Sequence, residues 1–125
     1  MTKKRQQLGR WGETKAAEYL EKQGYKIIDR NAYTQYGEID IVAQQTIKNT
    51  PYTIFVEVKT RTTTTFGYPE EAITNLKREH ILASAMAYLQ ENPQLSDNWQ
   101  VDVIAIRRLN TKTEPEIRHF ENVFS

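Results

Sequence analysis

Two carboxylates and a lysine interrupt the most apolar segments of the chain. Asp40 stands inside the run of residues 39–42, and Glu57 and Lys59 alternate with apolar residues in 52–59. A charge inside an apolar strand is unfavourable unless it is paired or binds a metal. If the two segments are neighbouring strands, Asp40 and Glu57 converge, and carboxylates at that range repel unless a cation lies between them. A hard cation, with water and phosphate in its remaining positions, would meet this need.

A surface ion pair is the simpler explanation for Glu57 and Lys59. Side chains alternate along a strand, so these two point to the same face and can pair there. An exposed pair of this kind contributes about 0–1 kcal/mol to stability. Asp40 favours the metal site instead, in which Lys59 would neutralise a phosphate or orient an attacking water.

A third acid, Glu13, is predicted on the buried face of the first helix. It stands three, four and seven residues before apolar positions, which places it on their helical stripe. These positions are Ala16, Ala17 and Leu20. A glutamate on a buried face needs a partner, although a capping or boundary glutamate is the alternative. Gly9 and Gly12 are poor helix formers, which indicates a close backbone approach to the sheet or to a phosphate.

The hydrophobic periodicity predicts a helix, three strands, a second helix and then further strands. The helices are expected at residues 8–23 and 69–90, and the strands at 25–30, 38–43, 52–59, 99–107 and 117–120. Residues 44–51 and 60–68 are expected to be loops. This order favours an α/β fold in which α-helices flank a mixed β-sheet. The length of 125 residues fits one domain, with residues 1–7 expected to be flexible.

Composition limits the class of protein and the kind of site. There is no cysteine, so any metal must bind oxygen or one of two histidines, which points to Mg²⁺ or Mn²⁺. No apolar run approaches the roughly 20 residues of a membrane span, and no apolar stretch follows the basic start. We therefore expect a cytoplasmic protein with no membrane partner. The net charge of +1 neither supports nor excludes nucleic acid.

The basic residues gather in short clusters that together could form a phosphate-binding surface. The clusters are Lys3-Lys4-Arg5, Lys59 with Arg61, Lys77-Arg78 and Arg107-Arg108. Solvated surface charge is the ordinary explanation for any one of them.

Asp40, followed after sixteen residues by Glu57-Val58-Lys59, is similar to the PD-(D/E)xK nuclease signature, with Ile39 in the place of its proline. The surrounding motifs are Gly9-Arg10-Trp11-Gly12-Glu13, Tyr36-Gly37-Glu38-Ile39-Asp40, Phe55-Val56-Glu57-Val58-Lys59-Thr60-Arg61, Phe66-Gly67, Pro69-Glu70-Glu71-Ala72 and Asp102-Val103. Together these motifs resemble the YraN-like family of bacterial proteins over nearly the whole chain. That family is grouped with Holliday-junction-resolvase-like endonucleases.

The resemblance implies a restriction-endonuclease-like core and a role for each matching residue. Asp40 and Glu57 match the metal-binding carboxylates, and the main-chain carbonyl of Val58 would be a further ligand. Glu13 matches the helix glutamate that resolvase-like members add to the metal site, and Lys59 matches the motif lysine. The implied catalytic residues are Lys59, Glu13, Asp40 and Glu57, with Mg²⁺ or Mn²⁺ as the cofactor.

Other residues are candidates for contact with nucleic acid or for structural roles. The nucleic-acid candidates are Arg10, Arg61, Lys77, Phe66 and Tyr68, and the aromatic ones stand in a threonine-rich loop that could stack on bases. Glu38 is expected to point away from the metal. Asp102 is interpreted as a hydrogen-bonded structural acid, and His80 and His119 as ordinary residues.

Three functions are compatible with these residues. The first is a metal-dependent endonuclease that hydrolyses phosphodiester bonds in DNA, including branched or junction DNA. The alternative is a nucleic-acid-binding accessory module with a nuclease-like fold and no cleavage activity of its own. The third is a structural or partner-binding protein. Resolvase-like nucleases often work as symmetric dimers, so we also expect a homodimer.

Overall fold

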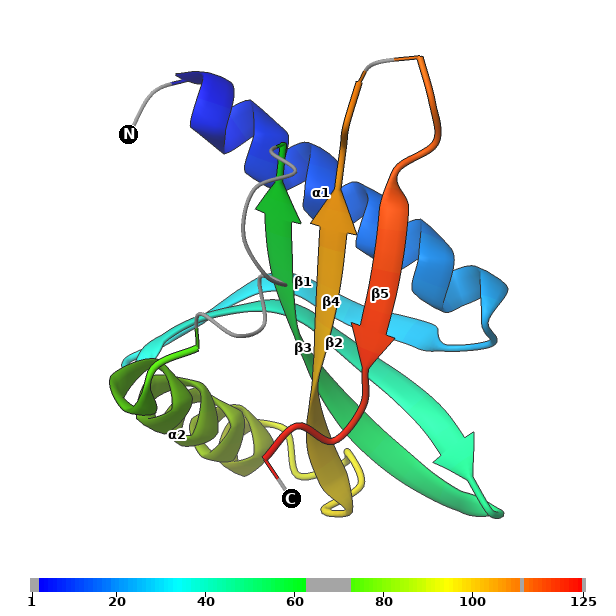
Figure 1. The fold of residues 1–125 in the computed structure, drawn as a ribbon. Coiled ribbons are helices and arrows are strands. Elements are labelled where there is room, and N and C mark those ends of the chain that lie inside the picture. Colours follow the sequence, from blue (N-terminus) through cyan, green and yellow to red (C-terminus); the bar gives the residue numbers. More distant parts are fainter. Residues whose placement is uncertain (1–2, 63–72, 111, 125) are drawn as a thin grey trace.

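The apolar segments that contain Asp40 and Glu57 are neighbouring strands of one mixed sheet. The computed structural model describes residues 3–62, 73–110 and 112–124, which form two helices and five strands. The elements are α1 (Lys3–Lys22), β1 (Lys26–Thr34), β2 (Gly37–Ile47), β3 (Thr50–Arg61), α2 (Asn75–Glu91), β4 (Trp99–Arg107) and β5 (Glu116–Phe120). The strands follow one another across the sheet in chain order, and only β3 and β4 are parallel among these described strands (Figure 1).

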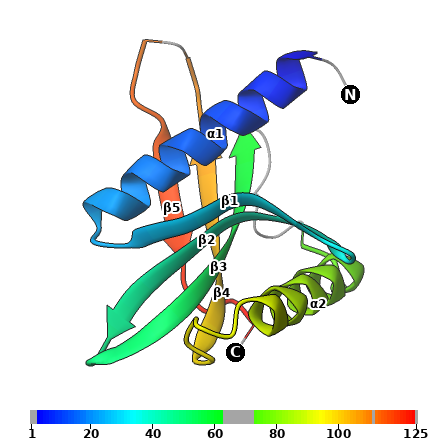
Figure 2. The same ribbon diagram turned by 180° about the vertical axis from the view of Figure 1, so that it is seen from behind.

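The two helices pack against opposite faces of this sheet (Figures 1 and 2). Ile54 and Val56 of β3 point toward α1 and join Leu20 in one core cluster. Phe55, between them, points toward α2 and joins Tyr88 in a second cluster. A strand covered on both faces reads as a continuous apolar run, which is why β3 was the clearest strand in the sequence. The predicted α/β fold, a mixed sheet flanked by helices, is confirmed and is consistent with a restriction-endonuclease-like core.

The first helix begins earlier than its apolar pattern predicted. α1 starts at Lys3 instead of residue 8, so residues 3–7, expected to be a flexible arm, are its first turns. These residues are exposed lysine, arginine and glutamine, which favour helix but carry no apolar stripe. The pattern of burial therefore could not reveal them. Within the described residues, neither helix is long and apolar enough to cross a membrane.

The second helix begins later than predicted. Its N-cap is Thr74, whose side chain accepts a hydrogen bond of 3.1 Å from the Lys77 amide. Ile73 also lies outside the helix, so the continuous helix predicted over residues 69–90 is wrong at residues 73 and 74. The predicted start at residue 69 lies outside the described residues. The preference of threonine for the N-cap position is the sequence feature that indicates this start.

The loop predicted at residues 44–51 is a tight hairpin instead. β2 runs to Ile47 and β3 begins at Thr50, so only Lys48 and Asn49 form the turn. Their φ angles of 49° and 67° lie in the left-handed region that a two-residue type I′ turn requires. This end of the hairpin projects beyond both helices, where polar residues are tolerated, and its polarity concealed the strands (Figure 1).

Gly12 lies where α1 passes directly over β3. A Cβ at this position would lie 2.0 Å from Oγ1 of Thr60 and 3.1 Å from its Cβ. We expect Gly12→Ala to lower the free energy of unfolding by about 1–3 kcal/mol, because the helix and the strand must move apart. Gly9→Ala is the matched control: no atom lies within 4 Å of its Cβ position, so it should stabilise α1 by up to about 1 kcal/mol. Urea unfolding of both variants measures the difference, and equal stabilities would contradict the close approach.

Candidate active site

β2 and β3 separate at Asp40. Their paired register ends with Ile41 opposite Val56, so Asp40 and Glu57 are the next residues out, where the ladder has stopped. Asp40 spans the gap with its side chain, because its Oδ2 accepts a hydrogen bond of 2.8 Å from the Val58 amide. Asp40 and Glu57 therefore stand on neighbouring strands, which was the condition for their convergence.

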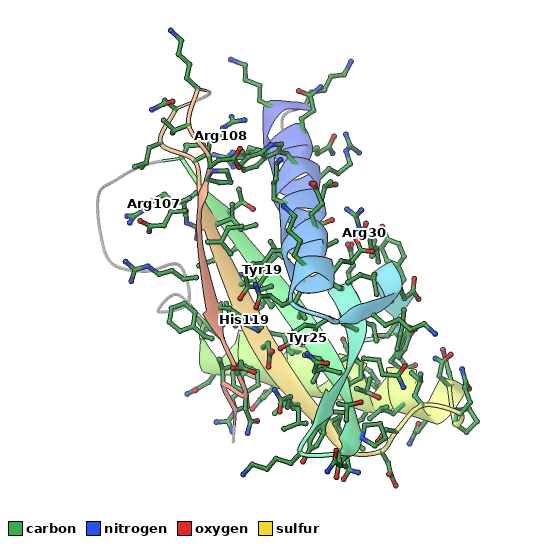
Figure 3. The ribbon with its side chains drawn as sticks, turned by 90° about the vertical axis from the view of Figure 1, so that its right-hand side faces the viewer. Tyr19, Tyr25, Arg30, Arg107, Arg108 and His119 are labelled. Carbon is green, nitrogen blue, oxygen red and sulfur yellow. The ribbon has the colours of Figure 1, made fainter. Side chains whose placement is uncertain are left out.

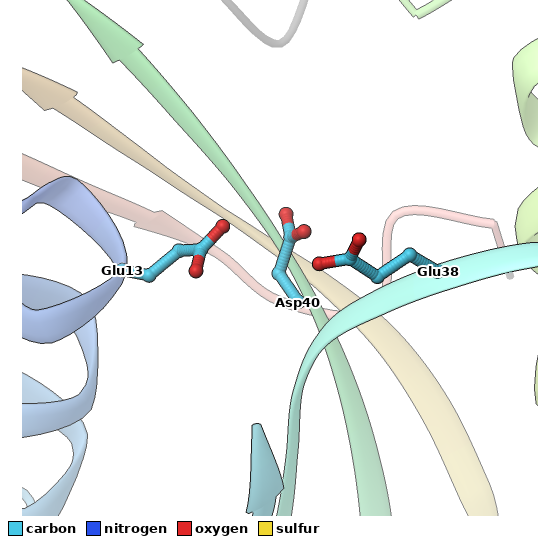
Figure 4. A group of neighbouring side chains, drawn as sticks. All are labelled: Glu13, Glu38 and Asp40. Atoms are coloured by element: carbon cyan, nitrogen blue, oxygen red, sulfur yellow. The ribbon is translucent and has the colours of Figure 1, made fainter. Parts of the chain in front are cut away.

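Three carboxylates converge beside this gap (Figure 4). Glu13 comes from α1, and Glu38 and Asp40 come from β2; one oxygen from each lies within 4.8 Å of the others. We call these three residues the acid cluster. The expectation that Glu38 points away is wrong, because residues two apart in a strand share a face and Glu38 is two residues from Asp40.

Asn31 on β1 connects two members of the acid cluster. Its side-chain amide donates a hydrogen bond of 2.8 Å to Oε1 of Glu13 and one of 2.6 Å to Oε1 of Glu38. The backbone of Asn31 has a φ of 53°, a left-handed conformation that asparagine adopts more readily than most residues. The sequence did not indicate Asn31, because its side-chain amide reaches Glu13 and Glu38 only after β1 has paired with β2.

Asp40 is the most perturbed acid of the site. Its pKa is raised from 3.8 to about 7, with burial as the largest cause and the negative charge of Glu57 as the next. The Val58 amide lowers it, whereas Glu13 and Glu38 raise it further. Asp40 therefore holds a proton far more tightly than an exposed aspartate, and a cation that displaced this proton would relieve the same repulsion.

Glu57 is buried and held by two lysines. Its Oε1 lies 3.3 Å from the Nζ of Lys59 and 3.2 Å from the Nζ of Lys77 on α2. Its side chain is 9% exposed, so the simple surface ion pair considered for Glu57 and Lys59 is not what the structure shows. Lys77, a candidate for nucleic-acid contact, reaches the site through Glu57.

The remaining predicted ligand is the carbonyl of Val58. In a strand the amide and carbonyl of one residue point to the same neighbouring strand. The Val58 amide points to Asp40, so its carbonyl is expected at the same gap between β2 and β3.

The other nucleic-acid candidates fall in different places. Arg10 is exposed on α1. Arg61 is exposed at the end of β3 and lines an open hollow together with Glu13. Phe66 and Tyr68 lie outside the described residues.

A second polar network lies away from the acid cluster, between β4 and β5. Asp102 is fully buried, and its Oδ2 lies 2.7 Å from Nε2 of His119. The other nitrogen of His119 lies 3.1 Å from the hydroxyl of Tyr19, and Tyr25 stacks at a tilt on the same ring (Figure 3). Asp102 is thus the hydrogen-bonded structural acid that was predicted, whereas His119, interpreted as an ordinary residue, is the centre of this network.

Comparison with known proteins finds relatives that cover nearly the whole chain. The profile described as "Uncharacterised protein family UPF0102" matches residues 12–106. A UPF0102 protein from Syntrophotalea carbinolica is 47% identical over 124 residues, which are 99% of this chain and 96% of that protein. One from Syntrophomonas wolfei subsp. wolfei is 42% identical over 118 residues, covering 94% of this chain and 97% of that protein. These names state a family and no activity.

Proposed function

The chain belongs to the UPF0102 family, the YraN-like proteins, and since that name states no activity, we propose a function from the geometry of the site. This function is that of a metal-dependent endonuclease that hydrolyses phosphodiester bonds in DNA, including branched DNA. The observation that carries this proposal is the convergence of Glu13, Glu38 and Asp40 at the point where β2 leaves β3. Glu57 and Lys59 stand on the facing strand. Carboxylates that gather at such a gap, with the ammonium of Lys59 on the facing strand, are typical of a phosphoryl-transfer site and contribute little to a packed core.

The donor set fits a hard divalent cation. Carboxylate oxygens from α1 and β2 come within 4.8 Å of one another, and oxygen is the donor that Mg²⁺ and Mn²⁺ prefer. Asp40, Glu13 and Glu38 would hold the ion, with the Val58 carbonyl as a further ligand. Both ion pairs of Glu57 use its Oε1, and a carboxylate has a second oxygen that can serve a cation at the same time. When bound, such an ion lowers the pKa of a coordinated water and polarises a phosphoryl oxygen.

The protein's own side chains supply orientation and charge. Asn31 fixes the carboxylates of Glu13 and Glu38 through two hydrogen bonds, so these two acids need little reorganisation. Lys59 sits 3.3 Å from Glu57, and its ammonium can pair with a phosphate oxygen as negative charge develops in the transition state. Lys77 keeps Glu57 paired when Lys59 turns to the substrate.

Incubation with DNA of different shapes tests this function. Plain duplex, nicked, flapped and four-way DNA are each incubated with Mn²⁺ or Mg²⁺, beside the same reactions in EDTA. We expect metal-dependent strand cleavage of at least one shape. Cleavage of none, with a folded protein, would overturn the proposal.

Lys59→Met separates the role of the lysine from that of the acids. We expect a loss of cleavage on the order of 100-fold or more, since the charge that faces the phosphate is gone. The rise in melting temperature caused by Mn²⁺ should persist, because the acid cluster is intact. The variant Lys77→Met is the control: it removes the other ion pair of Glu57 and should change cleavage much less. Equal losses in both variants would assign Lys59 only to holding Glu57.

The neutralisation of Glu57 by two lysines supports a second candidate function, a nucleic-acid-binding module without cleavage. Part of the acidic charge is balanced there without a cation. A salt-dependent gel shift, with no cleavage in either metal, is the result expected for this function.

A further inference from the structure

Two adjoining hollows run along the N-terminal half of α1. The first, of about 520 Å³, is lined by Glu13, Val58 and Arg61, so it opens at the acid cluster. The second, of about 540 Å³, is lined by Lys4, Trp11 and Arg108 among others. Both are also lined by Arg5, Leu8 and Thr62. The two hollows therefore adjoin at these three residues and together extend from Glu13 of the acid cluster to Lys4; we call the pair the groove.

Basic side chains from three elements line this groove. Lys4 and Arg5 come from the first turns of α1, Arg61 from the end of β3, and Arg108 from just after β4. Three of the four basic clusters seen in the sequence thus meet at one place, although they are far apart along the chain. The fourth is used elsewhere: Lys77 pairs with Glu57.

Two contacts hold the far end of the groove in place. The guanidinium of Arg108 lies 4.9 Å from the centre of the Trp11 ring. The Arg108 amide donates a hydrogen bond of 2.9 Å to the Arg61 carbonyl, which ties the end of β3 to the end of β4. A guanidinium stacked on an aromatic ring keeps its edge of N–H donors directed outward, which suits a phosphate.

We propose that this groove binds the phosphodiester backbone of a nucleic-acid strand and leads it to the acid cluster. The inference rests on the proposed function for its endpoint, but the binding that it predicts needs neither a metal nor cleavage. Arginine forks match phosphate oxygens in pairs, and successive cations along a groove match the repeated charge of a strand.

The shape favours a strand over an anionic membrane. A membrane surface is broad and would meet residues that protrude, whereas these cations line a hollow. The ring of Trp11, the aromatic residue that would otherwise insert among lipids, is covered by Arg108. The groove also ends at carboxylates, which a lipid headgroup layer has no reason to approach.

Binding of a fluorescein-labelled 20-nucleotide single-stranded DNA in EDTA tests this proposal. The variant Lys4→Gln/Arg5→Gln/Arg61→Gln should bind at least about tenfold more weakly at low salt. Its plot of log affinity against log salt concentration should be less steep by about 2–3, roughly one for each lost phosphate contact. The control variant Lys22→Gln/Lys26→Gln/Lys48→Gln removes the same charge from exposed positions outside the groove and should bind like the parent.

Tryptophan emission gives a second readout. The chain has two tryptophans. We expect the oligonucleotide to change the emission of Trp11, because a bound phosphate would move the guanidinium of Arg108 relative to the Trp11 ring. The change should vanish in Trp11→Phe and persist in Trp99→Phe. This result does not depend on the three charge substitutions.

The outcomes separate this inference from the proposed function. If the Lys4→Gln/Arg5→Gln/Arg61→Gln variant binds weakly and the control variant does not, the result supports the groove, even if the parent cleaves nothing in Mn²⁺. Cleavage by the parent with equal oligonucleotide binding in both triple variants would overturn the groove and keep the nuclease. Failure of the parent to bind the oligonucleotide, including the case in which it binds anionic phospholipid vesicles instead, would also overturn it.

Discussion

Replacing Asp40 with asparagine is expected to stabilise the metal-free protein at pH 8 and to abolish metal-dependent cleavage. Burial and the charges of nearby acids raise the pKa of Asp40 to about 7, so its ionised form is unfavourable in the fold. Asparagine keeps an oxygen that can accept the hydrogen bond from the Val58 amide. In EDTA at pH 8 the free energy of unfolding should rise by roughly 1–3 kcal/mol. Cleavage should fall on the order of 100- to 1,000-fold.

The pH dependence of stability has a definite sign. A carboxyl whose pKa is higher in the folded state stabilises the fold fully below its unfolded pKa, and this stability is lost as the pH rises through the folded pKa. For Asp40 the loss spans the range from 3.8 to about 7. The difference in stability between Asp40→Asn and the parent in EDTA should therefore grow over this range and level off above it. A difference that stays constant from pH 4 to pH 8 would contradict the raised pKa.

Metal binding provides the matching measurement. A cation must displace the proton of Asp40, so Mn²⁺ should raise the melting temperature of the parent more at pH 8 than at pH 6. In Asp40→Asn the rise should be small at both values. Thermal unfolding with and without Mn²⁺ measures this without any nucleic acid. An equal rise in both proteins would remove Asp40 from the metal ligands.

Asp102→Ala is expected to cause the largest loss of stability, about 3–5 kcal/mol. Asp102 is fully buried and has three partners: Nε2 of His119 at 2.7 Å, the Gln100 amide at 2.9 Å and the backbone N–H of Asn122 at 2.9 Å. Removing the carboxylate leaves one buried group, the Gln100 side-chain amide, and two part-buried groups without their acceptor, and each such loss is unfavourable. Chemical denaturation measures the loss.

Tyr19→Phe tests the other end of the same network. It removes only the hydroxyl that lies 3.1 Å from Nδ1 of His119, so a loss of about 0.5–1.5 kcal/mol is expected. Neither Tyr19→Phe nor Asp102→Ala should change the rise in melting temperature that Mn²⁺ causes. Loss of that rise in Tyr19→Phe would show that the network and the acid cluster are coupled.

The sequence predicted the residues whose charges conflict with their surroundings. Asp40 and Glu57 were found because they interrupt apolar strands, and Glu13 because it stands on an apolar helical stripe. Whether these acids bind a metal stays a prediction. Glu38 was misplaced although strand alternation puts it on the face of Asp40; the period of two, applied strictly, would have found it. Asn31 could not be found, because its role depends on which residues of α1 and β2 face it after folding.

The fold class was predicted, but the bounds of its elements were predicted well only where they are buried. β3 and β4 are buried and apolar, and their predicted bounds were close to the observed ones. The tip of the hairpin of β2 and β3 was missed because it is polar and projects beyond the core. The first turns of α1 were missed because they bury nothing. Periodicity reports burial, so elements that extend into solvent escape it.

The chain-order arrangement of the sheet has a consequence for how the protein folds. The acid cluster, Asn31 and Glu57 all belong to residues 13–57, within which β1, β2 and β3 pair through short antiparallel turns. Pairing β3 with β4 instead requires closure of the segment of residues 62–98. Contacts between distant residues carry a larger loop-closure entropy and form more slowly. Lengthening that segment should therefore slow folding, while the carboxylates already share one locally closed unit that can form ahead of it.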